Sequence, residues 1–168
     1  FNNFVMSETM EEVLERLEDD RIDVLFRPRS NSSDNDDYEG LINGIDASST
    51  SVSLADYSLV GTIFRENTGL LDANYMTAWE TNFLLAEAAE KGLITAPAKE
   101  LYESGVTQAY EYWNTALPET YLNTTGLYKG GDGDGNDEAI KQIITQKWIA
   151  SMINGYEGWI EYRRTGFP

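Results

Sequence analysis

Apolar residues recur at helical spacing in several stretches of the chain, and each stretch predicts an amphipathic helix. The first covers residues 7–20, where Ser7 can accept a hydrogen bond from the free amides at the helix start. Its apolar stripe is formed by Met6, Met10, Val13, Leu14 and Leu17. Later stretches at 77–92, 97–114 and from about 137 onward show the same periodicity. The pattern predicts a mainly helical protein.

Residues 77–114 predict a helical hairpin. Thr77 and Glu80 have the spacing of a capping box, in which each side chain bonds the other residue's backbone amide. Gly92 suits the position just after a helix, where the backbone turns left-handed. Because only a short link precedes the next helix, the two helices should run antiparallel. Small residues interspersed with aromatic ones make the pair resemble a tetratricopeptide hairpin.

The stretch after about Asp137 is apolar around more than half of its circumference, which predicts a largely buried helix. Asp137 is expected to cap it. Asn154-Gly155 then breaks the pattern, and the following residues form a second helical face. We expect this tail to be a core helix. The side chains predicted to pack against the 77–92 and 97–114 hairpin are Ile144, Trp148, Met152 and Trp159.

The remaining segments predict little regular structure. Residues 22–26 predict a short extended segment that ends at Pro28. Residues 29–72 are rich in Ser, Asn, Asp and Gly, which indicates a long loop region with at most two short strands, near 38–42 and 59–64. The predicted fold class is therefore mainly α, with tetratricopeptide-like hairpins, long irregular loops and at most short strands.

Composition narrows the classes of function. The 168 residues include 12 basic and 29 acidic side chains, a net charge of −17, which disfavours nucleic acid and anionic lipid as partners. The absence of His and Cys removes the commonest general base, thiol nucleophiles and the usual transition-metal ligands. No apolar run has the roughly 20 residues that span a bilayer. Carboxylate pairs, lysine and tyrosine remain for catalysis, so an enzyme is possible but not favoured.

Two acidic patterns suggest other chemistry. In the 130–138 loop, Asp132, Asp134 and Asn136 alternate as in a calcium-binding loop, but the closing glutamate is missing. Weak Ca²⁺ binding there is the alternative to a simple capping turn. Pairs of neighbouring glutamates could form an acid/base couple for glycoside hydrolysis, although a solvated helix face is the commoner explanation. These pairs are Glu87 with Glu90 and Glu157 with Glu161. Lys147, Arg163 and Arg164 are expected to pair with internal carboxylates.

The segment "QKWIASMINGYEGWIEYRRTGFP" contains Gln-Lys-Trp, Asn-Gly and Arg-Arg-Thr-Gly-x-Pro elements. In this order they resemble the late helix block of the SusD/RagB family of Bacteroidetes. "MTAWETNFLLAEAAEKG" and "AKELYESGVTQAYEYW" resemble the two helices before it, and "DDRI" resembles an Asp-Pro-Arg element. The departures from the family pattern are Asp20, Ala78 and Trp79.

The resemblance implies a surface-exposed lipoprotein of the cell outer membrane that is not an enzyme and needs no cofactor. Such proteins bind a glycan, an oligosaccharide or another nutrient and deliver it to a SusC-like TonB-dependent transporter. Family members are longer, so residues 1–168 are expected to be the C-terminal portion of a single SusD-like domain. Its parts would be a helix plus extended segment (1–28), the loop region (29–72) and a helical core (73–168). Membrane attachment would use only a lipid anchor outside this segment.

Ligand contacts in this family come mostly from variable loops. Tyrosine rings can stack on sugar faces, while carboxylates and amides take the hydroxyls. The candidates from the loops are Tyr38, Tyr57 and Tyr121 as platforms, with Asp56 and Asn123 as hydroxyl contacts. The alternative function is a helical-repeat protein–protein adaptor without a sugar site. Tyrosines gathered in a cleft would favour sugar binding, whereas an open helical groove would favour the adaptor.

Overall fold

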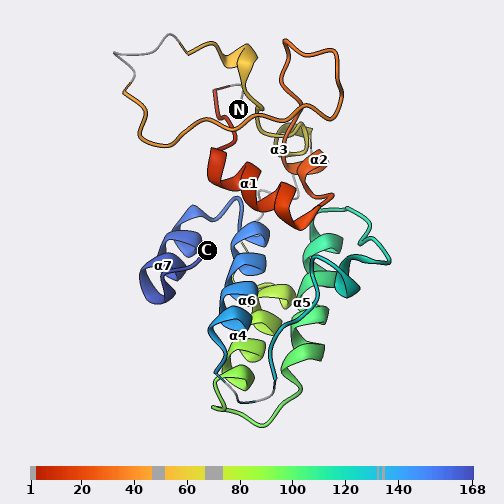
Figure 1. Ribbon diagram of the computed structural model, residues 1–168, viewed down its shortest axis with the longest axis vertical. Coiled ribbons are helices and arrows are strands. Elements are labelled where there is room, and N and C mark those ends of the chain that lie inside the picture. The colour runs from red at the N-terminus through yellow and green to blue at the C-terminus, as the bar shows by residue number, and fades with distance from the viewer. Residues whose placement is uncertain (1–2, 47–51, 67–73, 132, 134) are drawn as a thin grey trace. The chain divides into compact units, whose positions relative to one another are not determined.

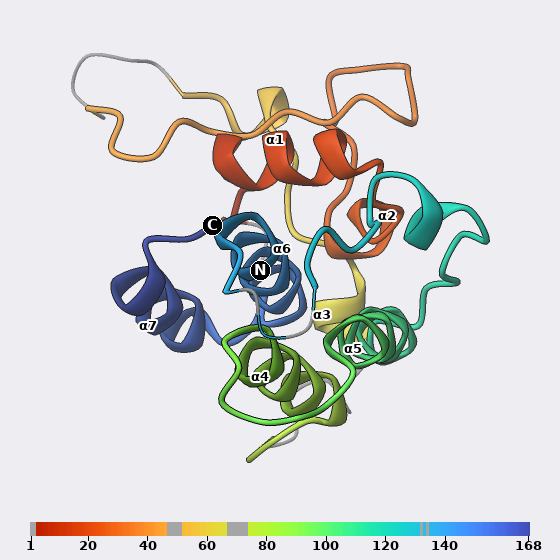
Figure 2. The ribbon, with the colours of Figure 1, turned by 60° about the horizontal axis from the view of Figure 1, so that its bottom comes forward.

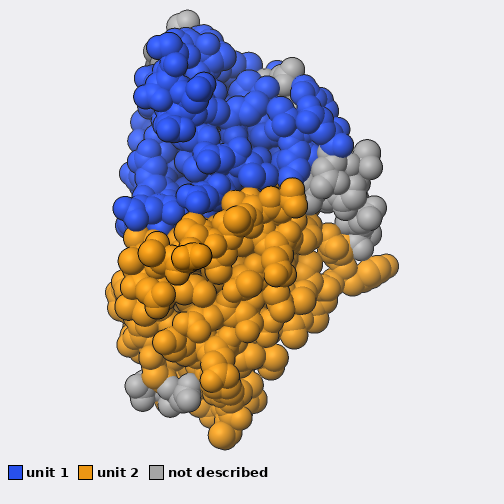
Figure 3. Space-filling model, turned by 90° about the vertical axis from the view of Figure 1, so that its right-hand side faces the viewer, with its two compact units in different colours: residues 1–73 blue, residues 74–168 orange. Residues whose placement is uncertain are grey.

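A computed structural model describes residues 3–46, 52–66, 74–131, 133 and 135–168 of the chain. The described part is mainly helical, as the sequence predicts, and no strand is assigned within it (Figure 1). The chain divides into two compact units, residues 1–73 and 74–168, coloured separately in Figure 3. Unit 1 contains α1 (Glu8–Leu17), α2 (Ile22–Leu25), the 3-10 helix η1 (Leu54–Asp56) and α3 (Ile63–Glu66). Unit 2 contains α4 (Ala78–Glu90), α5 (Ala98–Tyr112), η3 (Tyr121–Asn123), α6 (Asp137–Ala150) and α7 (Gly155–Thr165).

In unit 1, α1 forms where its pattern predicts. Ser7 caps the helix by accepting a hydrogen bond from the Met10 amide at 3.2 Å. The helix ends at Glu18, whose backbone is left-handed (φ 50°). The predicted stripe is buried, with Leu14 at 1% exposed. Local capping and periodicity are thus sufficient to define this helix.

The expected extended segment at residues 22–26 is wrong, because Ile22–Leu25 form the one-turn helix α2. Asp19 accepts hydrogen bonds from both the backbone amide and the Nε of Arg21, at 3.1 and 2.8 Å. This pairing folds the chain back directly after α1, and the Leu25 amide then bonds the Arg21 carbonyl at 2.9 Å. A buried charge pair two residues apart overrides the β propensity of the apolar residues that follow.

The loop region forms single bridges instead of the two short strands expected near 38–42 and 59–64. Leu41 pairs with Ser7, and Leu59 pairs with Val5. Residues 63–66, expected in part as a strand, form the short helix α3. Gly40 allows one close approach, because a Cβ there would lie 2.5 Å from the backbone nitrogen of Glu8. Backbone hydrogen bonds therefore tie the loop region to the start of α1.

Unit 2 is built on the predicted hairpin, in which α4 and α5 pack together and α6 contacts both (Figures 1 and 2). Thr77 caps α4 by accepting from the Glu80 amide at 3.3 Å. Gly92 takes the left-handed conformation expected after the helix (φ 66°). Gly105 of α5 lets Phe83 approach closely, since a Cβ would lie 2.7 Å from that ring. Phe83 is fully buried as a result.

The third long helix, α6, begins and ends close to the prediction. Its N-cap is Asn136, whose side chain accepts from the Glu138 amide at 2.9 Å. The expected cap, Asp137, is instead the first helical residue, where its charge still favours the positive end of the helix dipole. Ile143 and Ile144 are fully buried. α7 follows after Asn154, at the predicted break.

The prediction that the tail is a core helix is wrong in part. Ile144 is buried and Trp148 and Met152 are half-buried, but Trp159 is 60% exposed. The buried residues of α7 are Gly158 and Glu161. Gly158 lies against Trp148, because a Cβ there would be 2.9 Å from the indole Cδ1. α7 therefore packs through a glycine and a charged residue, and not through its aromatic side chains.

Candidate functional site

The candidate site in unit 1 is a polar surface formed by three loop segments. We call it the loop surface and define it by Arg29, Asn31, Tyr38, Asp56 and Tyr57. Asn31 donates from its side chain to Asp56 Oδ1 at 2.5 Å. The Ser58 amide bonds the Glu39 carbonyl at 2.8 Å, so the neighbours Tyr38 and Tyr57 lie on adjacent segments. The surface brings together three of the five residues predicted from the sequence.

Within the loop surface, the two tyrosines differ in what their hydroxyls do. The Tyr38 ring is half-buried and its hydroxyl donates to Asp23 Oδ1 at 2.7 Å. Burial, and to a smaller extent this hydrogen bond to a carboxylate, raises the pKa of Tyr38 above its ordinary value. Tyr38 is therefore a neutral, oriented ring. Tyr57 is also half-buried.

The polar groups of the loop surface are held at their places by ionic and amide contacts. Arg29 forms an ion pair with Asp37 at 2.7 Å, and hydrogen bonds from Arg29 and Ser32 lower the pKa of Asp37. Asp56 is exposed while it accepts from Asn31. One oxygen of that carboxylate is thus oriented by the protein, and a carboxylate can accept further bonds from ligand hydroxyls.

The other two predicted residues lie in unit 2, so no single unit holds all five. Tyr121 is only 2% exposed, and its hydroxyl accepts from Gln146 Nε2 at 2.8 Å. Its ring meets Tyr110 edge-on at 5.5 Å between centroids. In this structure Tyr121 packs the loop onto the helices and offers no ring face to solvent. Asn123 is exposed at the end of η3.

A second polar surface, which the sequence did not lead us to predict, is an open depression along α5. Leu122, the chain neighbour of Asn123, also lines it. Its polar residues are Glu100, Glu103, Ser104, Thr107, Gln108 and Glu111. The signal was present in the sequence, because these residues recur at helical spacing on the face of α5 opposite its apolar one. Carboxylate, hydroxyl and amide groups of this kind suit a ligand rich in hydroxyls.

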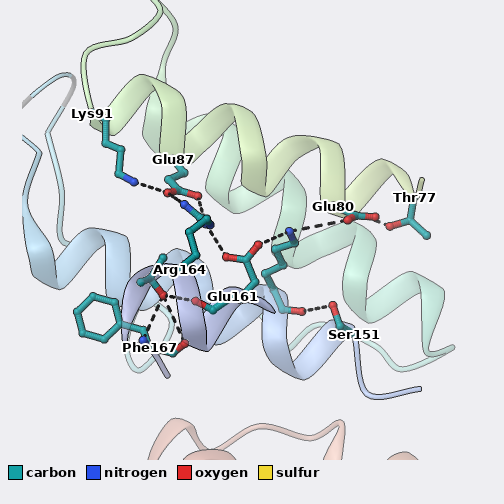
Figure 4. Close-up of polar contacts among 10 residues, drawn as sticks. Thr77, Glu80, Glu87, Lys91, Ser151, Glu161, Arg164 and Phe167 are labelled. Carbon is teal, nitrogen blue, oxygen red and sulfur yellow. Dashed lines mark hydrogen bonds and ion pairs between the residues drawn. The ribbon is translucent and has the colours of Figure 1, made fainter. Parts of the chain in front are cut away.

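One glutamate of each pair considered for glycoside hydrolysis, Glu87 and Glu161, is engaged in a network that joins α4, α6 and α7 (Figure 4). Arg164 holds both oxygens of Glu87, at 2.5 and 2.7 Å, and Lys91 also donates to Glu87. Glu161 accepts from Lys147 at 2.8 Å and from Arg164 at 2.5 Å. The expected internal pairing of Lys147 and Arg164 is confirmed.

The network sets the charge state of Glu87. Burial raises the pKa of Glu87, but hydrogen bonds from Arg164 and Lys91 outweigh burial and lower it below its ordinary value. A general acid needs the opposite shift, toward neutral pH. Glu87 is thus an ionised structural carboxylate. Arg163, by contrast, lies over the Trp159 ring, with its guanidinium carbon 5.2 Å from the centroid.

Glu90 has a structural role of its own. Its side chain is fully buried at the end of α4, where it accepts hydrogen bonds from the Tyr128 hydroxyl and, at 3.1 Å, from the Asn136 amide. The Glu90 carbonyl also accepts from the Gly135 amide at 2.7 Å. Glu90 therefore anchors the end of the acidic 130–138 loop to the hairpin.

The described part of the chain holds no group of three or more acidic side chains that could bind a metal ion. Asp132 and Asp134 of the calcium prediction lie outside the described residues. Asn136, the third member of that pattern, uses its side chain to cap α6. Among the described helices, none is both long and apolar enough to cross a bilayer.

Comparisons with known proteins show which proteins are similar to this chain in sequence and fold. Residues 1–168 match the model of the SusD-like family described as "Starch-binding associating with outer membrane". A SusD homologue from Bacteroides vulgatus superposes with a TM-score of 0.79 at 30% identity, over 98% of this chain and 38% of its own. A chitin-binding SusD homologue from Flavobacterium johnsoniae gives 0.72 at 26% identity, over 98% and 37%. A SusD homologue from Bacteroides fragilis gives 0.76 at 20% identity, over 98% and 40%, which shows the shared fold.

The match has a defined extent. This chain spans about two fifths of the length of those solved structures. No curated protein matches the sequence. The resemblance in the helix blocks, the helical architecture and the family match over residues 1–168 agree with one another. The chain therefore belongs to the SusD-like family.

Proposed function

We propose that this chain is the C-terminal portion of a SusD-like domain that binds an extracellular glycan or another nutrient without chemically altering it. The single observation that carries the proposal is the family match over residues 1–168, whose description names starch binding at the outer membrane. The chitin-binding relative supports the same class of ligand. Delivery to a SusC-like TonB-dependent transporter and anchoring as a surface lipoprotein of the outer membrane complete the proposal.

The loop surface supports this function by its chemistry. A pyranose presents C–H groups on its faces and hydroxyls around its edge, so its site combines an aromatic ring with oriented acceptors and donors. Tyr38 and Tyr57 supply rings on adjacent segments, and Asp56 supplies an acceptor held by Asn31. The net charge of −17 favours a neutral sugar over an anionic one.

Asn123 remains a proposed hydroxyl contact on a second surface, beside the polar face of α5. Tyr121 remains a proposed ligand residue only through its support of that region, because its ring is enclosed. The helical-repeat adaptor stays the alternative function, and the open depression along α5 is the feature that favours it. Weak Ca²⁺ binding in the 130–138 loop is a further prediction from the sequence.

The experiment is a binding assay on the full-length protein with soluble starch and chitin oligosaccharides as probes. Tyr38→Ala and Tyr57→Ala together should weaken binding at least about tenfold, since each stacked ring contributes on the order of 1 kcal/mol. Tyr75→Ala is the matched control, because Tyr75 is fully exposed and belongs to unit 2, so it is not one of the residues that form the loop surface. Unchanged affinity in the double variant, with an intact circular dichroism spectrum, would exclude the loop surface as the sugar site.

A further inference from the structure

In α7, the buried side of the helix carries small and charged residues, and the exposed side carries large apolar ones. Its buried residues are Gly158 and Glu161, and the polar contacts that join it to α4 and α6 are the ionic ones of Figure 4. Its large apolar side chains are exposed instead. The exposed ones are Tyr156 (83%), Trp159 (60%), Ile160 (46%) and Tyr162 (56%). A surface helix of a self-contained domain shows the reverse arrangement, with its apolar stripe toward the core.

The composition of this outward face is that of a protein interface. We call it the outer face of α7 and define it by Tyr156, Trp159, Ile160, Tyr162 and Arg163. Trp, Tyr and Arg are the residues most enriched among the side chains that dominate binding between protein surfaces. Arg163 already lies over Trp159, which orders both side chains and leaves guanidinium donors at the rim of the aromatic patch.

Three occupants of the outer face can be compared on physical grounds. A sugar needs oriented acceptors and donors around an aromatic ring, whereas the outer face has no carboxylate or amide side chain, and Arg163 already covers one face of the Trp159 ring. A second copy of the chain would bring together two molecules that each carry −17, at a cost in long-range repulsion. Further polypeptide of the same protein faces neither obstacle.

The relatives show that such polypeptide accompanies this architecture. The Bacteroides vulgatus and Flavobacterium johnsoniae structures match 98% of this chain, yet the match covers only 38% and 37% of their length. In both, therefore, the counterparts of α4 to α7 belong to a protein that contains more than an equal length of additional chain. Additional chain of that length can supply apolar side chains that residues 1–168 do not contain.

We infer that the outer face of α7 is an internal packing surface, covered by polypeptide of the same protein outside residues 1–168. The covering segment presents apolar side chains to Trp159 and Ile160 and an oxygen acceptor to Arg163. This inference rests on the proposal that the chain is part of a longer SusD-like domain. It does not depend on sugar binding at the loop surface, so either can fail without the other.

Thiol labelling tests the inference, because the chain has no cysteine of its own. Ile160→Cys reports on the outer face, and Ser104→Cys on α5 is the control at an exposed helical position in the same unit. Each variant is made both in the 168-residue chain and in the longer protein that contains it. Modification by a water-soluble thiol reagent is followed by mass spectrometry of the labelled peptide, and circular dichroism verifies the fold.

In the 168-residue chain, both cysteines should react at similar rates. In the longer protein, the cysteine at position 160 should react at least about tenfold more slowly. A thiol covered by packed chain reacts only when that chain opens. The control should react equally in both. Equal rates at position 160 would overturn the inference. Protection that needs added starch or chitin oligosaccharide would assign the face to a sugar, and protection of the short chain that grows with its concentration would assign it to a second copy.

Discussion

Replacing Glu161 by glutamine tests the charged network that joins α7 to the hairpin. The Glu161 carboxylate is 4% exposed, and it accepts from Lys147 at 2.8 Å and from Arg164 at 2.5 Å. Glutamine has nearly the same shape but no charge, and its amide group would face one of these two donors with another donor. The substitution therefore keeps the packing nearly unchanged and removes the charge together with one hydrogen bond.

The magnitude follows from burial and distance. At 2.8 Å and an effective dielectric constant of about 20, the attraction between Lys147 and Glu161 is about 6 kcal/mol. The cost of removing both ions from water offsets much of this, so the pair itself contributes little net stability. Removing one partner is different, because Lys147 is only 2% exposed, and its remaining ion pair within the described residues is the longer one with Glu80, at 3.8 Å. We expect Glu161→Gln to lower the free energy of unfolding by about 3 kcal/mol, the low end for a broken buried pair.

Urea denaturation followed by far-ultraviolet circular dichroism measures this difference. Arg163→Gln is the matched control, since Arg163 lies on the same helix but is exposed, and it should change stability by less than about 1 kcal/mol. Replacing Lys147 and Glu161 together, by methionine and leucine, should cost less than Glu161→Gln alone, because Arg164 keeps Glu87 as its partner and Glu80, which loses Lys147, is only half-buried. A loss below about 0.5 kcal/mol in Glu161→Gln would show that the network is solvated, and the reasoning would fail.

Two further predictions concern other carboxylates. Arg164 and Lys91 lower the pKa of Glu87 below 4.5 despite its burial, so its stabilising effect is full above about pH 4.5 and is lost as the pH falls through the lowered value. Glu87→Gln should flatten the dependence of the unfolding free energy on pH below about 4.5, and an unchanged pH profile would contradict the assigned pairing. Isothermal titration calorimetry should show Ca²⁺ binding to the 130–138 loop no tighter than roughly 10⁻⁴ to 10⁻³ M, since the closing glutamate is missing. A sub-micromolar dissociation constant would overturn the capping-turn interpretation.

The helices themselves are decided by interactions within a few residues, and this explains why they could be predicted. Ser7 and Thr77 cap the helices that follow them, and Gly92 turns the chain where its missing Cβ permits φ 66°. Apolar periodicity then places Leu14 and Ile144 on buried faces. Each of these features is a property of a short stretch of chain, whatever surrounds it.

The predictions were wrong where a side-chain contact that apolar periodicity does not reveal decided the structure. Residues 22–25 look extended by composition, but the buried pair of Asp19 and Arg21 turns them into a helix. Tyr121 lies in an irregular loop that offered no helical face to explain it, yet Gln146 and Tyr110 enclose it. A loop tyrosine exposed to a ligand and one packed under the loop have the same local sequence.

α7 shows most clearly which features depend on the local sequence and which depend on tertiary contacts. Its sequence alone determined that a helix would begin at the Asn154-Gly155 break and that it would carry an aromatic face. Only the tertiary structure decided which face turns inward. Glu161 and Arg164 find buried partners on α6 and α4, and Gly158 permits close approach to Trp148, so Trp159 is left outside. The free energy of packing a helix depends on the surface it meets, and periodicity along one segment contains no information about that surface.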